Sequence, residues 1–269
     1  MIRVLSGLAL GAAAFALVWF LPSRALLAVI MVMAALAFFE YARLVRTVGA
    51  ALPVTVSLVA TLAACVLAAQ PLSFATAALP AAGITLLAVA VSLMASGGSG
   101  AALVHGASAA MLAPLYIGLP LGTLAAIHAV AGREAVVTLV VTVAASDSFQ
   151  YYSGRTFGRH PLAPTLSPKK TIEGAVGGFV LAPLVLVAIA HWWLPRVSPL
   201  AAWVVGLGIV LAGIAGDLFE SALKRAAGVK DSGTLIPGHG GMLDRIDALI
   251  FNGPMVLLYV QFVRPLLLG

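Results

Sequence analysis

The chain has 269 residues, of which 62% are hydrophobic and 9% are charged, with a formal net charge of +6. Soluble domains are about 45–50% apolar and about 25% charged, so this composition excludes an ordinary soluble globule. The single cysteine, Cys65, excludes an internal disulfide, a cysteine zinc cluster and a Cys-x-x-Cys redox pair.

Apolar stretches bounded by charge, proline or glycine predict nine membrane spans, and the mean hydropathy of +1.11 supports them. They lie near 4–21, 25–42, 51–69, 76–95, 108–130, 134–152, 173–195, 199–218 and 246–263. Glycines and prolines interrupt 96–132, where one span could be two short pieces or a broken helix. Residues 1–21 could be a signal peptide, but we expect a retained helix because no convincing cleavage site follows. The sequence thus predicts an all-α, polytopic integral membrane protein of about nine transmembrane helices.

The charges divide the chain into two parts. Only Arg3, Arg24, Glu40, Arg43 and Arg46 precede Gly132, and most of the others crowd into 147–173 and 217–247. We therefore expect residues 1–132 to be a scaffold and 133–269 a catalytic region, within one integrated membrane domain. Glu40 and Arg43, three positions apart at a helix end, are interpreted as a surface pair.

Loop charge also predicts orientation. Ten Lys and Arg residues fall in loops after the even-numbered spans and five fall on the opposite side. The positive-inside rule then places the even loops, including both charge-rich segments, in the cytosol and the N-terminus outside.

The densest polar segment runs from 216 to 247 and contains three aspartates at helix ends. Asp244 and Asp247, at i and i+3, share a helix face, which Asp217 can meet if its helix is a neighbour. Converging carboxylates beside basic residues are typical of a magnesium site for a nucleotide. The alternative is a carboxylate–arginine network that pins two helix ends.

The same segment offers fixed positive charge and flexible backbone. Its cations are Lys224, Arg225, Lys230 and Arg245. Glycines 238, 240 and 241 around His239 would let backbone N–H groups approach a phosphate closely.

A second polar segment runs from 147 to 174. Asp147 follows an apolar run, and Ser167-Pro168-Lys169-Lys170-Thr171 precedes a helix. Either Ser167 or Thr171 could simply cap that helix, and the lysines could simply enforce topology.

Both segments resemble a known family. The longer match reads Ser221-x-Leu223-Lys224-Arg225, four residues, Lys230-Asp231-x-Gly233-x-x-Ile236-Pro237-x-His239-Gly240-Gly241-Met242-x-Asp244-Arg245-Ile246-Asp247. It resembles the signature of the phosphatidate cytidylyltransferases, or CDP-diacylglycerol synthases. The segment with Asp147, Tyr151, Gly154-Arg155 and Ser167-Pro168-Lys169-Lys170-Thr171-x-Glu173-Gly174 resembles their second polar stretch. The resemblance covers about residues 147–250, and Gln150 and Ala248 depart from the usual pattern.

The resemblance implies transfer of CMP from CTP to phosphatidate, giving CDP-diacylglycerol and pyrophosphate in phospholipid biosynthesis, with Mg²⁺ either alone or together with a second cation. It also implies a nine-helix fold, a homodimer, a bacterial inner (cytoplasmic) membrane location and an active site facing the cytosol. The lipid bilayer is the expected surroundings, and no nucleic-acid partner is expected. Because phosphatidate brings an ionised phosphate oxygen, the reaction needs charge neutralisation and positioning more than a general base.

The expected site residues follow from the motifs. The metal ligands are Asp217, Asp244 and Asp247; the catalytic residues are Asp217, Lys224, Arg225, Lys230, Asp231, His239 and Arg245; the substrate-binding residues are Asp147, Arg155, Ser167, Lys169, Lys170, Ser221, Gly240 and Gly241. His239 is expected to shape the glycine turn or to donate to phosphate.

Three other classes of protein compete with this interpretation. A secondary transporter would place its acids at mid-span and show inverted repeats. A polyprenol or phytol kinase would need a general base for its alcohol acceptor. A CDP-alcohol phosphotransferase would carry an Asp-Gly, Ala-Arg and spaced-Asp pattern, which this sequence does not contain.

Overall fold

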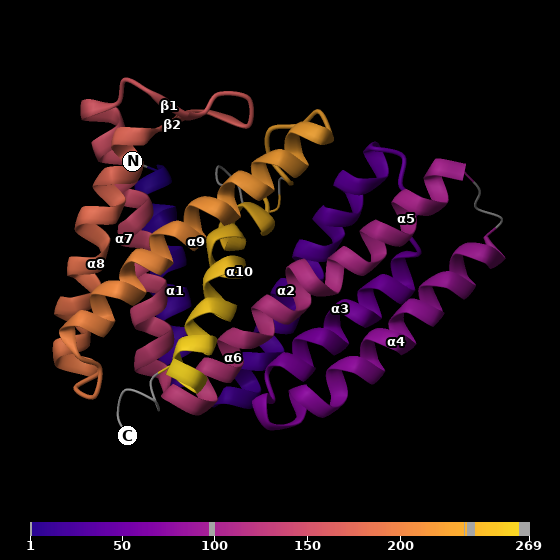
Figure 1. Ribbon diagram of the computed structural model, residues 1–269, viewed down its shortest axis with the longest axis horizontal. Coiled ribbons are helices and arrows are strands. Elements are labelled where there is room, and N and C mark those ends of the chain that lie inside the picture. The colour runs from indigo at the N-terminus through magenta and orange to yellow at the C-terminus, as the bar shows by residue number, and fades with distance from the viewer. Residues whose placement is uncertain (1, 97–99, 234, 236–239, 264–269) are drawn as a thin grey trace. The chain divides into compact units, whose positions relative to one another are not determined.

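The computed structural model describes residues 2–96, 100–233, 235 and 240–263, and most of these are helical (Figure 1). In chain order the elements are α1 (Ile2–Phe20), α2 (Ser23–Thr47), α3 (Val54–Ala68), α4 (Pro71–Ala95), α5 (Gly100–Ala113), η1 (Pro114–Gly118), α6 (Leu119–Ala131), α7 (Arg133–Phe157), β1 (Pro161–Ala163), β2 (Ser167–Thr171), α8 (Ile172–Trp193), α9 (Pro199–Ala226), α10 (Leu243–Leu258) and η2 (Tyr259–Val263). Each of the nine predicted spans overlaps a helix.

In the part of the chain that the structure describes, four helical runs are long and apolar enough to cross a membrane: Ser23–Thr47, Gly100–Ala131, Ile172–Trp193 and Pro199–Ala226. Within the described residues, Gly11–Phe20, Val54–Ala68 and Pro80–Ala95 are shorter apolar helices. The prediction of an all-α membrane protein is therefore confirmed in its coarse form.

The interrupted stretch from 100 to 131 is one helical run with an irregularity inside it. α5, η1 and α6 follow one another without a break, and η1 is a π-helical turn that begins at Pro114. Proline has no N–H to donate to the residue four positions earlier, so a proline inside a helix favours a wider turn of this kind.

The chain forms two compact units, and both α9 and α10 contribute to each of them. The first unit comprises Met1–Leu21, Ile127–Ala222 and Asp247–Gly269, and the second comprises Pro22–Ala126 and Leu223–Ile246. The division into a scaffold and a catalytic region stays a prediction about function.

In the first unit α7 and α8 pack along each other, joined by the β1–β2 hairpin (Figure 1). Glycines make this packing close: a Cβ on Gly174 would lie 2.7 Å from the Gln150 carbonyl oxygen, and one on Gly178 would lie 2.7 Å from the Gln150 Cγ. Gly178 thus makes room for the Gln150 side chain. One buried hydrophobic cluster of this region is formed by Ala175, Ala182, Val210 and Ile214.

The hairpin pairs β1 and β2 antiparallel, with Pro161 opposite Thr171. Thr171 is also the N-cap of α8, where its hydroxyl accepts a hydrogen bond from the Gly174 N–H at 3.1 Å. Glu173 accepts hydrogen bonds from the backbone N–H groups of Arg159 at 3.0 Å and His160 at 3.3 Å. These bonds fix the start of α8 against the hairpin.

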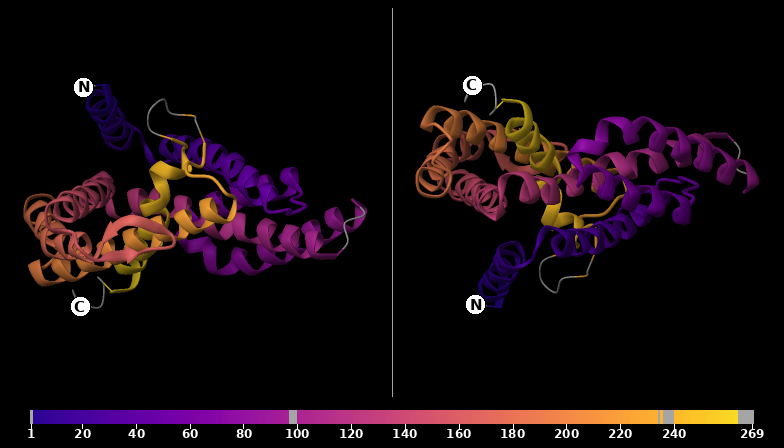
Figure 2. Two further views of the ribbon diagram at one scale, coloured as in Figure 1. Left: turned by 90° about the horizontal axis from the view of Figure 1, so that it is seen from above. Right: turned by 90° about the horizontal axis from the view of Figure 1, so that it is seen from below.

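In the second unit α3 packs against α2, α4 and η1, and α4 packs against α5 (Figure 2). Tyr41 on α2 donates a hydrogen bond to the Ala109 carbonyl on α5 at 3.0 Å. Any Cβ on Gly118 or Gly122 would collide with the carbonyl oxygens of Thr61 and Cys65, respectively. Backbone therefore meets backbone here, and Cys65 is fully buried, as expected of a small core residue.

Candidate functional site

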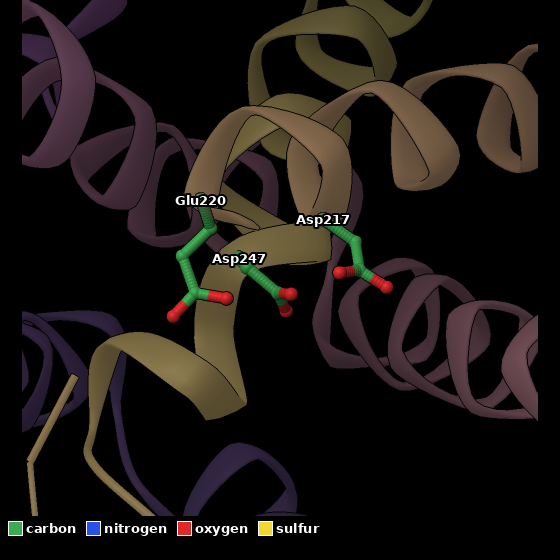
Figure 3. A group of neighbouring side chains, drawn as sticks. All are labelled: Asp217, Glu220 and Asp247. Carbon is green, nitrogen blue, oxygen red and sulfur yellow. The ribbon is translucent and has the colours of Figure 1, made fainter. Parts of the chain in front are cut away.

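Three carboxylates gather in the first unit. Asp217 and Glu220 lie on α9 and Asp247 lies on α10, and one oxygen from each falls within 4.8 Å of the others (Figure 3). Glu220 is only 1% exposed, and the other two are half-buried. So many negative groups in so small a volume repel one another unless positive charge balances them.

Local sequence explains how the three carboxylates meet. Asp217 and Glu220 are at i and i+3 and therefore lie on the same face of α9. Just before them, Gly216 lets α10 approach, because a Cβ there would lie 2.5 Å from the Asp247 carbonyl oxygen. The close contact between the two helices brings Asp247 alongside the pair on α9.

The second polar segment meets the same cluster. Lys170, at the end of the hairpin, forms an ion pair with Asp217. Asp147 on α7 and Lys170 are both close enough to Asp247 to interact with it electrostatically. The Ser221 hydroxyl donates to the Asp217 Oδ1 at 3.4 Å. Residues from three helices and the hairpin thus surround one acidic site.

Another polar cluster lies in the second unit, around Asp244. Its Oδ1 accepts from the Lys224 ammonium at 2.6 Å. Its Oδ2 accepts from the Ser232 N–H at 3.0 Å, the Ser232 hydroxyl at 3.0 Å and the Gly241 N–H at 2.8 Å. Gly240, with φ +81°, occupies the left-handed region, and a Cβ there would lie 2.7 Å from Oδ2. Asp244 therefore organises the turn that precedes α10.

Comparison with known proteins identifies the family of the chain. A model of the cytidylyltransferase family matches residues 1–263. The chain belongs to the cytidylyltransferase family.

Several curated proteins are similar to parts of the chain. The chain is 41% identical over 154 residues to a phosphatidate cytidylyltransferase of Helicobacter pylori, covering 56% of this chain and 57% of that protein. It is 45% identical over 119 residues to one of Thermotoga maritima, covering 40% and 42%. It is 40% identical over 131 residues to the uncharacterized protein YnbB of Escherichia coli, covering 49% and 44%. The chain thus spans about half the length of these curated relatives.

The structure brings many of the predicted site residues together, in two groups. Those of the first unit are Asp147, Lys170, Asp217, Ser221 and Asp247; those of the second are Lys224, Gly240, Gly241 and Asp244. Asp244 and the other two predicted metal ligands thus belong to different units, and a site shared by all three aspartates stays a prediction. The Gly241 N–H, expected to face a phosphate, donates to Asp244 instead.

The remaining predicted residues lie mostly on the surface. Arg155, Lys169, Arg225, Lys230, Asp231 and Arg245 are exposed, Ser167 begins β2, and His239 lies outside the described residues. Arg155 donates to the Tyr151 hydroxyl at 3.3 Å.

Two acidic residues were missed by sequence reasoning. Glu220 belongs to the carboxylate cluster, and its signal was the i, i+3 spacing from Asp217, the same rule that paired Asp244 with Asp247. Glu40, interpreted as the surface partner of Arg43, is in fact 4% exposed and bonded to residues about 200 positions away. Sequence spacing gives no signal for a contact of that range.

Proposed function

We propose that this chain is a phosphatidate cytidylyltransferase that transfers CMP from CTP to phosphatidate and releases pyrophosphate. The observation that carries the proposal is the cluster of Asp217, Glu220 and Asp247 in contact with Lys170, in a chain of the cytidylyltransferase family. Relatives that bear the name phosphatidate cytidylyltransferase support the choice of lipid substrate.

The carboxylate cluster fits a divalent cation. Mg²⁺ prefers oxygen ligands at about 2.0–2.1 Å and usually takes one or two carboxylates plus substrate phosphates and water. Oxygens on one such ion lie about 2.8–4.2 Å apart, and the three carboxylate oxygens of the cluster all lie within 4.8 Å of one another. Asp217, Glu220 and Asp247 would hold the ion, which when bound neutralises charge on the triphosphate. Asp244 as a further metal ligand, and a second cation, stay predictions from the sequence.

Electrostatic positioning accounts for the reaction. An ionised phosphate oxygen of phosphatidate attacks the α-phosphorus of CTP, a new P–O bond forms, and the bond to the β-phosphate oxygen breaks as pyrophosphate leaves. The protein must therefore hold two anions together in line. Lys224 and the exposed Arg225, Lys230 and Arg245 would neutralise the lipid phosphate and the leaving pyrophosphate.

The predicted substrate contacts divide between the hairpin side and the turn before α10. Lys170 lies at the acidic cluster and is suited to the triphosphate, while exposed Lys169 and Arg155 would meet the lipid phosphate. Other proposed contacts are Asp147, Ser167, Ser221, Gly240 and Gly241, with Asp231 orienting Lys230 and His239 donating to phosphate.

A purified-protein assay tests the function. Protein in detergent is incubated with CTP, phosphatidate and Mg²⁺, and pyrophosphate and CDP-diacylglycerol are measured. We expect both products in equal amounts, with none when Mg²⁺ is chelated or when a polyprenol replaces phosphatidate. Product from an alcohol lipid and none from phosphatidate would refute the proposal and would indicate a lipid kinase instead.

We also propose a setting for the reaction: about nine membrane crossings in a bacterial cytoplasmic membrane, a homodimer, and both clusters on the cytosolic side. Four helical runs support membrane insertion by length and composition, and the loop charges support the orientation. Cysteines replacing the exposed Thr165 and Leu235 in a Cys65→Ala background test the orientation. An impermeant reagent should label both cysteines only after cell lysis. Labelling of both in intact cells would show that the orientation is the opposite of the one proposed.

A further inference from the structure

Glu40 is a buried acid in the N-terminal half of the chain, outside both polar segments. It lies near the C-terminal end of α2 and is 4% exposed. Its Oε1 accepts from the Met242 N–H at 2.9 Å, and its Oε2 accepts from the Leu243 N–H at 2.8 Å and the Ser232 hydroxyl at 2.8 Å. All of these residues belong to the second unit.

These bonds suit a carboxylate better than any neutral group. The N–H groups of Met242 and Leu243 stand at the start of α10, where a helix leaves its first backbone donors unsatisfied and favours negative charge. Hydrogen bonds to an ionised acceptor are roughly twice as strong as neutral ones. Glu40 therefore caps α10 from a different helix, in place of a side chain from the preceding turn.

Two glycines of the family signature make room for this carboxylate. A Cβ on Gly233 would lie 2.7 Å from the Glu40 Oε1 and 3.0 Å from its Cδ, and all three of its nearest neighbours would be Glu40 atoms. A Cβ on Gly241 would collide with the Glu40 Oε2 and with the Ser232 hydroxyl. The absence of side chains at these two positions is explained by the volume that Glu40 occupies.

Glu40 is also linked to the Lys224–Asp244 pair. The Ser232 hydroxyl lies 2.8 Å from the Glu40 Oε2 and 3.0 Å from the Asp244 Oδ2, so two carboxylates share this one donor. Since Asp244 also accepts from the backbone of Ser232 and Gly241, displacement of Ser232 changes the surroundings of both acids. The position of Asp244, and of the Lys224 ammonium bound to it, depends on Glu40.

We propose that Glu40 is a positioning residue for the cytidylyltransferase reaction. It anchors Ser232, Met242 and Leu243 so that Lys224 is held where it neutralises phosphate, and it does not itself contact substrate. This inference rests on the proposed function, and it gives the N-terminal half, expected from sequence to be scaffold alone, a direct part in ordering the signature.

The first test compares Glu40→Gln with Glu134→Gln, the same chemical change at an acid outside the core on α7. The amide introduced by Glu40→Gln directs an N–H group at either Met242 or Leu243, which are donors themselves. We expect kcat/KM for CTP, per folded molecule and well below the melting temperature, to fall at least tenfold in Glu40→Gln, mainly through KM. Glu40→Asp, which keeps the charge, should recover part of the loss, and Glu134→Gln should match wild type.

A second variant keeps the test decisive if Glu40→Gln does not fold. Gly233→Ala retains the Glu40 charge but displaces its carboxylate, so it should reproduce the rise in KM. In a Glu40→Ala background the methyl group added by Gly233→Ala has space. Gly233→Ala should therefore lower the melting temperature less in the Glu40→Ala variant than it does in the wild-type protein.

The outcomes separate the inference from the function on which it rests. Wild type without turnover from CTP and phosphatidate overturns the proposed function and this role together. Wild-type turnover with unchanged kcat/KM per folded molecule in both Glu40→Gln and Gly233→Ala overturns the positioning role alone. Strictly additive melting shifts for Glu40→Ala and Gly233→Ala overturn the contact itself.

Discussion

Replacing Asp244 by asparagine separates a structural role of this acid from a metal-binding one. The Asp244 side chain is 8% exposed and that of its partner Lys224 is 13% exposed. Asparagine would keep one acceptor oxygen and direct an amide N–H₂ either at the Lys224 ammonium or at the donors from Ser232 and Gly241. Either arrangement leaves a buried charge or buried donors without an acceptor.

The structure sets the size of the effect. Breaking a buried ion pair by removing one partner costs about 3–5 kcal/mol. A loss of 1 kcal/mol in the free energy of unfolding lowers the melting temperature of a chain of about 150–250 residues by about 2–4 °C. We therefore expect the melting temperature of Asp244→Asn to fall by on the order of 10 °C. Asp231→Asn is the matched control, because Asp231 is exposed, and surface substitutions usually change stability by less than about 0.5 kcal/mol.

The assay is thermal melting in detergent, without Mg²⁺ or CTP, followed by Mg²⁺-dependent CTP binding. Lys224→Met combined with Asp244→Asn should lose less stability than the sum of the two single changes, because the double variant leaves no unpaired buried charge. If Asp244→Asn melts with wild type but loses Mg²⁺-dependent binding of CTP, the structural reasoning is refuted. Asp244 would then be a cation ligand, as its sequence spacing from Asp247 predicts.

Further changes test the acidic cluster and its supports. In EDTA, Asp247→Asn should melt at or above the wild-type temperature, because one repelling charge is gone. Mg²⁺ at 100 times its Kd should stabilise wild type by about 2.7 kcal/mol, and Asp247→Asn should lose most of this stabilisation. Equal shifts of the melting temperature by Mg²⁺ in both proteins would contradict the metal site. Gly216→Ala should cost about 1–3 kcal/mol because its methyl group meets backbone, whereas Gly208→Ala meets only the flexible end of Met255 and should melt like wild type. Lys170→Met should lower kcat/KM for CTP more than Lys169→Met does, because only Lys170 contacts the cluster, and equal losses would contradict this.

Most of the helices and part of the candidate site could be predicted from the sequence. Helix positions were predictable because an apolar run between charged or glycine-rich breaks is local information. The closeness of Asp217 and Asp247 was predictable, because leaving either ionised acid alone at a helix end near lipid is costly. The β1–β2 hairpin was not, since Ser167–Thr171 reads as a polar loop, although Thr171 was one of two candidates for the cap it forms.

Hydrogen-bond partners that are set by tertiary packing could not be predicted from the sequence. The Gly241 N–H looked available for phosphate because the acceptor that takes it, Asp244, is identifiable only from the turn geometry. Glu40 is separated from Ser232 by 192 positions, and neither periodicity nor motif spacing reports a contact of that range. An acid within a helix that is predicted to span a membrane is nevertheless a signal, because such a group needs hydrogen-bond donors or a cation.

The π-helical turn at Pro114–Gly118 has a consequence for the phase of the helix around it. Gly106 and Gly118 both meet backbone, at Ala51 and at Thr61, although they are twelve residues apart. In an uninterrupted α-helix, at about 100° per residue, twelve steps would rotate the second glycine about 120° away from the first. A π turn absorbs one residue, which leaves the equivalent of eleven steps and a rotation of about 20°.

The extra residue therefore acts as a phase correction that returns α6 to the face already used by α5. If residues 114–118 wound as a regular α-helix with no residue removed, Gly118 and Gly122 would rotate off α3 and bulkier side chains would take their place, whereas deleting one residue there would leave the phase unchanged.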